Sequence, residues 1–341
     1  MKLQLQSLFT VALLLNAAAL FAQGKTGADS TAGKQSSSES YIRFDDTRNT
    51  AWTEDFEQVG IKSGKDGQVQ KAFFYKTRSG KPKPLVVSLH TWSGDFRQKD
   101  ELAPLCKGKD VNYIHPDFRG PNKTSSACCS ELALSDIDDA ITFAIKNAKV
   151  DTAAIYVIGV SGGGYATLST FMKSRHNIKK FSAWVPITNL EAWYQESTIM
   201  KSKYAPDILA CTDSKDTVNL ANARQKSPVF MKTPAAKLKS AKLFIYAGIY
   251  DGIQGSVPIT HSINFYNKLL TDLSVKDKTK YVSVPEKLHL LEFRRPLGNF
   301  GNIGDRKVCL KKEYGNARLT LFEGNHEMLP EYALDELLKN E

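Results

Sequence analysis

A serine lies among glycines in Gly159-Val160-Ser161-Gly162-Gly163, which fits the pattern G-x-S-x-G. The apolar segment AIYVIGV precedes this serine, and YATLSTFMKS, with the character of a helix, follows it. Between a strand and a helix, this pattern places the serine hydroxyl on a strained turn, where it can attack a carbonyl carbon. The glycines allow the helix to approach the strand closely because they carry no Cβ atom. The sequence therefore predicts Ser161 as a nucleophile and not as part of a flexible loop.

A serine hydroxyl needs a base that takes its proton and a third group that orients the base. His326 stands in FEGNHEML, between the last predicted strand and the final predicted helix. Asp251 precedes it in the chain and directly follows the predicted strand 242–250, which gives the order nucleophile, acid, base. We expect Asp251 to orient the imidazole of His326. The remaining candidates occupy less suitable places, at strand ends, in helices or in long connections: His90, His115, His176, His261, His289, Asp207, Asp213, Asp216, Asp272 and Asp277.

Attack on a carbonyl creates an oxyanion, which needs two N–H donors placed in advance. The backbone N–H of Gly162, directly after the nucleophile, is the first candidate. The second candidate lies in LHTWSGD, the loop after an earlier strand, where the N–H of Trp92 is favoured and that of Thr91 is the alternative. Trp92 could also serve only in packing.

The elements that must hold these residues predict an α/β fold. From Pro84 onward, short apolar segments alternate with segments of helical spacing, as expected for parallel strands buried on both faces. FEQVGI and QVQKAFFYKT flank a turn with Gly and Asp, and they predict an antiparallel N-terminal hairpin. We expect a mostly parallel central sheet with helices on both faces. The predicted strands are 84–90, 111–118, 154–160, 181–187, 242–250 and 317–324, and the predicted helices are 130–147, 256–272 and 330–339.

The first residues differ in character from the rest of the chain. After Lys2 comes an apolar run, shorter than the ~20 residues that span a bilayer, and it ends in small and apolar residues at Ala22. We expect residues 1–22 to be a signal peptide cleaved near Ala22, so that the protein is secreted or periplasmic without a membrane span. Residues 23–40 are rich in Ser, Gly, Thr and Lys and predict a disordered linker.

Residues 41–341 are expected to form a single catalytic domain. Two connections, 189–236 and 276–314, are long for a compact domain, and long connections are often functional. We interpret them as insertions over one end of the sheet.

The formal net charge of +10 comes from segments such as KPK, KSK and KLKSAK, which are typical of solvated lysine-rich loops. Attraction of an anionic substrate is the alternative interpretation. The sequence has no basic recognition helix and no zinc motif, so a nucleic-acid partner is not expected. We also expect no metal and no organic cofactor, because no cluster of ligand residues stands out.

Five cysteines can form at most two disulfides in an oxidising compartment, which leaves one over in a monomer. We expect Cys106 to pair with Cys128 or Cys129, and Cys211 to pair with Cys309.

Five segments carry a resemblance to a known family: LHTWSGD, DFRG, GVSGGGY, GIYDGIQGSVPITHS and GNHE. In their order and spacing the chain resembles the α/β-hydrolases, particularly the prolyl-oligopeptidase-like and acetylxylan-esterase-like branches. The resemblance implies an α/β-hydrolase fold with Ser161, Asp251 and His326 as the catalytic triad. Two departures stand out, since Thr91 takes a usual glycine position and Val257-Pro258 stands farther than usual from Asp251. The second departure predicts a longer turn.

Three functions remain open. We favour a secreted serine carboxylic-ester hydrolase that works through an acyl-enzyme on acylated carbohydrate, such as an acetyl or feruloyl ester of a polysaccharide. A prolyl-oligopeptidase-like serine peptidase comes second, because those enzymes usually carry a β-propeller for which the segment before LHTWSGD is too short. A non-catalytic binding member of the fold comes third. Trp184, Arg294 and Arg295 are candidate substrate-binding residues, the arginines for a uronate carboxylate.

Overall fold

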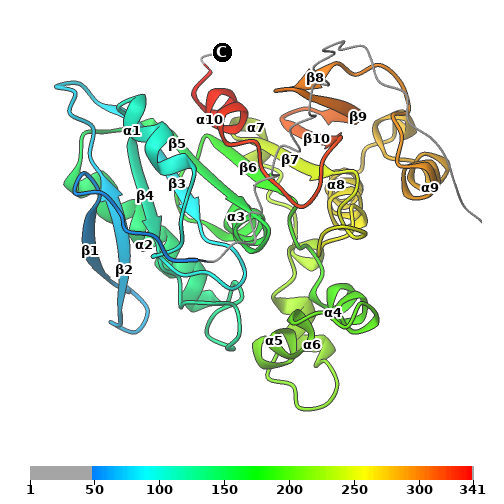
Figure 1. The fold of residues 1–341 in the computed structure, drawn as a ribbon, viewed down its shortest axis with the longest axis horizontal. Coiled ribbons are helices and arrows are strands. Elements are labelled where there is room, and N and C mark those ends of the chain that lie inside the picture. Colours follow the sequence, from blue (N-terminus) through cyan, green and yellow to red (C-terminus); the bar gives the residue numbers. More distant parts are fainter. Residues whose placement is uncertain (1–47, 340–341) are drawn as a thin grey trace, which may run out of the picture. The chain divides into compact units, whose positions relative to one another are not determined.

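The computed structural model of the chain describes residues 48–339 (Figure 1). Contacts within the chain divide it at Ser40, and all described residues belong to the unit Tyr41–Glu341. The expected signal peptide, residues 1–22, and the expected linker, residues 23–40, lie outside the described residues. None of the described helices combines the length and apolar character needed to cross a membrane.

A ten-stranded sheet runs through this unit in the order β1-β2-β4-β3-β5-β6-β7-β10-β9-β8. The six central strands, from β4 to β10, pair in parallel, and the antiparallel β1–β2 hairpin adds to one edge. The predicted α/β-hydrolase fold with a mostly parallel sheet is thus confirmed. The strands are β1 Glu57–Lys62, β2 Val69–Tyr75, β3 Lys83–Leu89, β4 Asn112–Pro116, β5 Val150–Val160, β6 Lys180–Trp184, β7 Lys242–Gly248, β8 Asn302–Ile303, β9 Arg306–Tyr314 and β10 Ala317–Phe322.

Helices cover both faces of the sheet, as β6 shows. Phe181 packs edge-on against Phe171 of α3, whereas Trp184 packs against Tyr332 of α10. Residues three apart in a strand point to opposite faces, so α3 and α10 lie on opposite sides of the sheet. The helices are α1 Leu102–Gly108, α2 Glu131–Asn147, α3 Gly162–Lys173, α4 Leu190–Ile199, α5 Tyr204–Cys211, α6 Leu220–Gln225, α7 Lys237–Ser240, α8 Thr260–Asp272, α9 Val284–Phe293 and α10 Pro330–Leu338, with 3₁₀ turns η1 Pro228–Phe230 and η2 Lys278–Lys280.

The two long connections have different structures. Residues 189–236 carry α4, α5 and α6, which lie together in Figure 1. Residues 276–314 carry α9 and also β8 and β9, and β9 pairs antiparallel with β10. The second connection therefore extends the sheet, which corrects the expectation of an insertion over its end. Strand β9 contains charged residues such as Lys311 and Lys312 and only a short apolar stretch. It therefore does not stand out in the sequence as an apolar strand.

Candidate active site

Ser161 lies on the turn between β5 and α3, where its pattern predicts it. Its backbone has φ 58° and ψ −118°, a strained conformation that costs on the order of 1–3 kcal/mol and needs support from its surroundings. That support is present, because the N–H of Ser161 donates to Trp184 O at 2.9 Å and the N–H of Tyr165 donates to Ser161 O at 2.9 Å. A Cβ on Gly163 would overlap the carbonyl oxygen of Leu89. The turn is packed between strands and is not a flexible loop.

Asp251 and His326 form a buried pair. His326 Nδ1 lies 2.7 Å from Asp251 Oδ2, and the other carboxylate oxygen accepts the N–H groups of Gly252 at 2.9 Å and Val257 at 3.0 Å. With Asp251 1% exposed, these bonds fix the carboxylate in one orientation. An imidazole that donates Nδ1–H to a carboxylate keeps Nε2 as a proton acceptor.

The sheet brings Ser161, Asp251 and His326 to one edge. They follow β5, β7 and β10, which pair in parallel through β6, so their carboxyl ends meet at the same side of the sheet. The ends of β7 and β10 are joined directly, because the N–H of Ile249 donates to Phe322 O at 2.7 Å. This edge is where ligands bind in open α/β sheets.

Ser256, which the sequence patterns do not single out, lies beside the imidazole. Its Oγ is 3.4 Å from His326 Nε2, the nitrogen on the far side of the ring from Asp251. The hydroxyl of Ser256 therefore stands beside the atom that must accept the proton of the nucleophile. The long spacing between Asp251 and Val257 was the available signal, since the extra residues of that turn bring Ser256 to the imidazole.

The backbones of Gly162 and Trp92 are in direct contact. A Cβ on Gly162 would fall 2.5 Å from Trp92 Cα and still closer to Trp92 N. Gly162 begins α3, and the first N–H groups of a helix have no acceptor inside the helix. In the described part of the chain, the N–H of Trp92 also has no backbone acceptor, whereas that of Thr91 donates to Gln98 Oε1 at 3.0 Å. Of the two alternatives, Trp92 thus has the available donor.

Helices of the connection 189–236 close over this region. The indole of Trp92 donates to Asp207 Oδ2 of α5 at 3.2 Å, and burial raises the pKa of that carboxyl. The ring of Trp193, in α4, meets the ring of Trp92 edge-on at 4.7 Å, and its own Nε1–H donates to Ser256 O at 2.8 Å. These contacts link the loop that carries Trp92 to the loop that carries Asp251.

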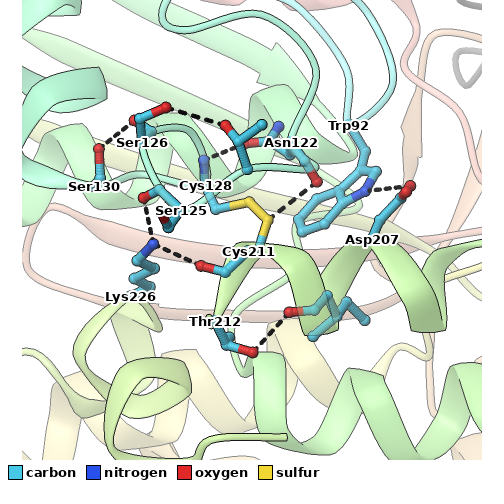
Figure 2. The surroundings of a disulfide bond; sticks show 12 residues. Trp92, Asn122, Ser125, Ser126, Cys128, Ser130, Asp207, Cys211, Thr212 and Lys226 are labelled. Carbon is cyan, nitrogen blue, oxygen red and sulfur yellow. Dashed lines mark hydrogen bonds between the residues drawn. A yellow bond between two sulfur atoms is a disulfide. The ribbon is translucent and has the colours of Figure 1, made fainter. Parts of the chain in front are cut away.

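A disulfide joins Cys128 to Cys211, with Cα atoms 6.0 Å apart (Figure 2). Both expected pairings are therefore wrong, and Cys106, Cys129 and Cys309 are buried thiols. Cys106 belongs to α1, which packs against α10, whereas the carbonyl of Cys128 accepts the hydroxyl of Tyr165 from α3. The sheet separates these two layers, and only the folded position of α5 brings Cys211 to Cys128.

The three predicted substrate-binding residues lie in different environments. Trp184 is fully buried, stacks on Tyr246 at 4.0 Å and faces α10, so it belongs to the core. Arg294 donates from Nη1 to Ile249 O at 2.8 Å, close to Asp251, and burial lowers the pKa of its guanidinium. Arg295 is exposed. Within residues 48–339, no group of three or more His, Cys, Asp or Glu side chains is disposed to hold a metal ion.

A sequence model described as the prolyl oligopeptidase family matches residues 103–296, more than half of the 341-residue chain. The match includes Ser161 and Asp251 and ends before His326. Acylamino-acid-releasing enzyme 1 of Oryza sativa subsp. japonica is 22% identical over 256 residues, which cover 71% of this chain and 32% of that enzyme. This chain therefore spans about a third of the length of that curated relative.

Two solved structures share the fold. Pyrococcus horikoshii acylaminoacyl peptidase matches with a TM-score of 0.56 and 16% identity, over 86% of this chain and 41% of that one. A Mycobacterium tuberculosis puromycin-hydrolyzing peptidase matches with a TM-score of 0.54 and 12% identity, over 83% and 38% of the two chains.

These matches overturn the expectation of a carbohydrate esterase. The matching family and the two similar structures are named for peptidases, the Oryza sativa relative is named for the release of acylamino acids, and none of these four supports the acetylxylan-esterase branch. The expectation failed because it took the short segment before LHTWSGD as an argument against a peptidase. The family match lies downstream of that segment and does not depend on it.

Proposed function

Because this chain belongs to the prolyl oligopeptidase family, we propose that it is a serine peptidase that hydrolyses short peptides through an acyl-enzyme. The observation that carries acyl transfer is the buried Asp251–His326 pair, 2.7 Å between Oδ2 and Nδ1, at the sheet edge that also carries the strained Ser161 turn, and the family match favours an amide over an ester as the bond cleaved. A nucleophile, an oriented base and free N–H donors are the parts that acyl transfer requires.

In the proposed mechanism, Nε2 of His326 takes the proton of Ser161 Oγ as Oγ bonds to the carbonyl carbon of the substrate. The N–H groups of Gly162 and Trp92 donate to the oxyanion, and Asp251 stays ionised and stabilises the imidazolium. Nε2–H protonates the leaving amine as the C–N bond breaks. Water repeats the sequence and releases the acid.

Peptides with an acylated N-terminus are the proposed substrate class. In support, the similar proteins from Oryza sativa and Pyrococcus horikoshii are named for acylated amino acids.

The test compares N-acetyl-alanyl p-nitroanilide, alanyl p-nitroanilide and p-nitrophenyl acetate as substrates. We expect the protein to release p-nitroaniline faster from the acetylated anilide than from the unblocked one. Ser161→Ala should abolish release from both anilides. Release from the ester alone, by a protein whose Ser161 reacts with a fluorophosphonate, would refute peptidase activity. Equal release from both anilides would refute the preference for an acylated N-terminus.

We also propose that the protein is exported and that its signal peptide ends near Ala22. The Cys128–Cys211 disulfide supports this, because structural disulfides persist mainly in oxidising compartments. N-terminal sequencing of the exported protein tests the proposal, and an intact Met1 on the mature protein would refute it.

A further inference from the structure

We propose that Asp207, on α5, is a positioning residue that holds Trp92 so that its backbone N–H points at the oxyanion. Hydrolysis then depends on a helix of the connection 189–236, outside the strand ends that carry the triad. The inference rests on the proposed function, because it takes the N–H of Trp92 as an oxyanion donor.

The loop that carries Trp92 follows the end of β3 and belongs to no helix or strand, so contacts with other segments must hold it in place. Its carbonyl oxygen accepts the N–H of Asn122 at 2.8 Å, and its indole donates to Asp207 Oδ2 at 3.2 Å. The ring also packs against Trp193, and the residue is 2% exposed. A rotation of this residue about its Cα would break the indole bond, so Asp207 opposes such a rotation.

Helix α5 is itself fastened to the same loop region (Figure 2). Cys211, one helical turn after Asp207, forms the disulfide with Cys128, and its Sγ lies 3.1 Å from Asn122 O. Lys226 donates to Cys211 O at 2.7 Å and to Ser125 O at 2.6 Å. Asp207 and Asn122 thus contact Trp92 from two segments that are braced against each other.

The hydrogen bond between Trp92 and Asp207 requires an acceptor oxygen at position 207 but not a negative charge. Burial raises the pKa of Asp207, while the Trp92 hydrogen bond and the nearby Lys123 and Lys203 act in the opposite direction. An asparagine in this place keeps an oxygen that can accept the indole N–H. A leucine of similar size keeps the packing but leaves the N–H without an acceptor. The two substitutions at Asp207 therefore separate the hydrogen bond from the volume.

The experiment measures kcat and KM for N-acetyl-alanyl p-nitroanilide in Asp207→Leu, Asp207→Asn, Trp92→Phe and the Trp92→Phe/Asp207→Leu double variant. We expect Asp207→Leu to lower kcat roughly 10- to 100-fold with KM little changed, because the donor is misplaced but not removed. Asp207→Asn should recover most of this loss. The double variant should lose about as much as either single variant, because all three remove the same bond.

Asp216→Leu is the matched control, since it removes an exposed carboxylate from the same connection. A peptide aldehyde, which forms an oxyanion on Ser161, should lose affinity in parallel with kcat/KM in Asp207→Leu. The inference is overturned if Asp207→Leu lowers the thermal midpoint but keeps kcat and aldehyde affinity. It is also overturned if the losses in Trp92→Phe and Asp207→Leu multiply in the double variant.

A failure of the proposed function can be told apart from a failure of this inference. If the wild-type protein cleaves no peptide but a fluorophosphonate labels Ser161, the peptidase proposal fails. The rates at which the fluorophosphonate labels Ser161 in the same variants then decide the role of Asp207. We expect these rates to fall in the same order as expected for kcat, most in Asp207→Leu and least in Asp207→Asn. If the wild-type protein is not labelled, both proposals are overturned.

Discussion

Substitution of Gly162 by alanine tests the geometry of the nucleophile turn most directly. The new Cβ would fall 2.2 Å from Trp92 N, whereas ordinary contact begins at 3.4 Å. The two backbones must therefore separate by about 1.2 Å, although the N–H of Ser161 is held by Trp184 O and the carbonyl of Trp92 by the N–H of Asn122. A displacement near 1 Å misplaces both proposed oxyanion donors at once, and loss of one such donor costs ~10²–10³ in kcat. We expect Gly162→Ala to lower kcat by about this factor, or roughly 2.7–4 kcal/mol of transition-state stabilisation.

The assay is hydrolysis of N-acetyl-alanyl p-nitroanilide, with KM expected to change little because the donors act mainly in the transition state. Gly108→Ala is the matched control, since Gly108 ends α1 and a Cβ there meets nothing within 4 Å. If Gly162→Ala folds and keeps kcat within about threefold of the wild type, the contact with Trp92 does not constrain the donors. The reasoning that a small displacement of these backbones impairs catalysis is then refuted.

Three further predictions concern other parts of the molecule. Asp251→Asn should lower kcat by about 10⁴ with the fold intact, because an amide no longer holds the imidazole in the tautomer that accepts from Ser161, and wild-type kcat would refute the assignment of the acid. The paired change Cys128→Ala/Cys211→Ala should lower the free energy of unfolding by ~2–4 kcal/mol, and a reducing agent should destabilise the wild type but not this variant. A hydrogen bond from Arg119 lowers the pKa of Asp66 to about 2 from the usual 3.8, so its contribution to stability is present above pH 3.8 and lost as the pH falls toward 2. The difference in thermal midpoint between wild type and Asp66→Asn should therefore shrink over that pH range, and a constant difference would contradict the prediction.

The expectation of an esterase was overturned for a chemical reason. Ester and amide hydrolysis use the same nucleophile, base and oxyanion donors, so the pattern around Ser161 does not distinguish the leaving groups. Other side chains surround the site, and Trp92, Trp193 and Ser256 reach it from three separate segments. Their proximity could not be read from the order of residues in the chain.

Contacts between distant segments could not be predicted from the sequence either. Asp207 lies in a long connection where the sequence gives it no role beyond that of a less suitable triad acid, yet its carboxylate accepts the indole N–H of Trp92. Trp184 is an aromatic residue of the kind that binds substrates, but it lies at the end of β6 on the face covered by α10. Burial on one face or the other depends on the register of the strand, which a short apolar segment leaves open.

Local sequence by itself determined most of the strands, the helices α2, α3, α8 and α10 and the turn at Ser161, because apolar periodicity and the glycines on that turn act within a few residues. It also placed Asp251 and His326 after strands, and parallel strands necessarily end at one edge. Only the tertiary structure decided the Cys128–Cys211 pairing, the addition of β9 to the sheet and the contact of α5 with Trp92. Those features depend on how two long connections fold back, and the packing that selects their positions involves residues up to 115 apart in the chain.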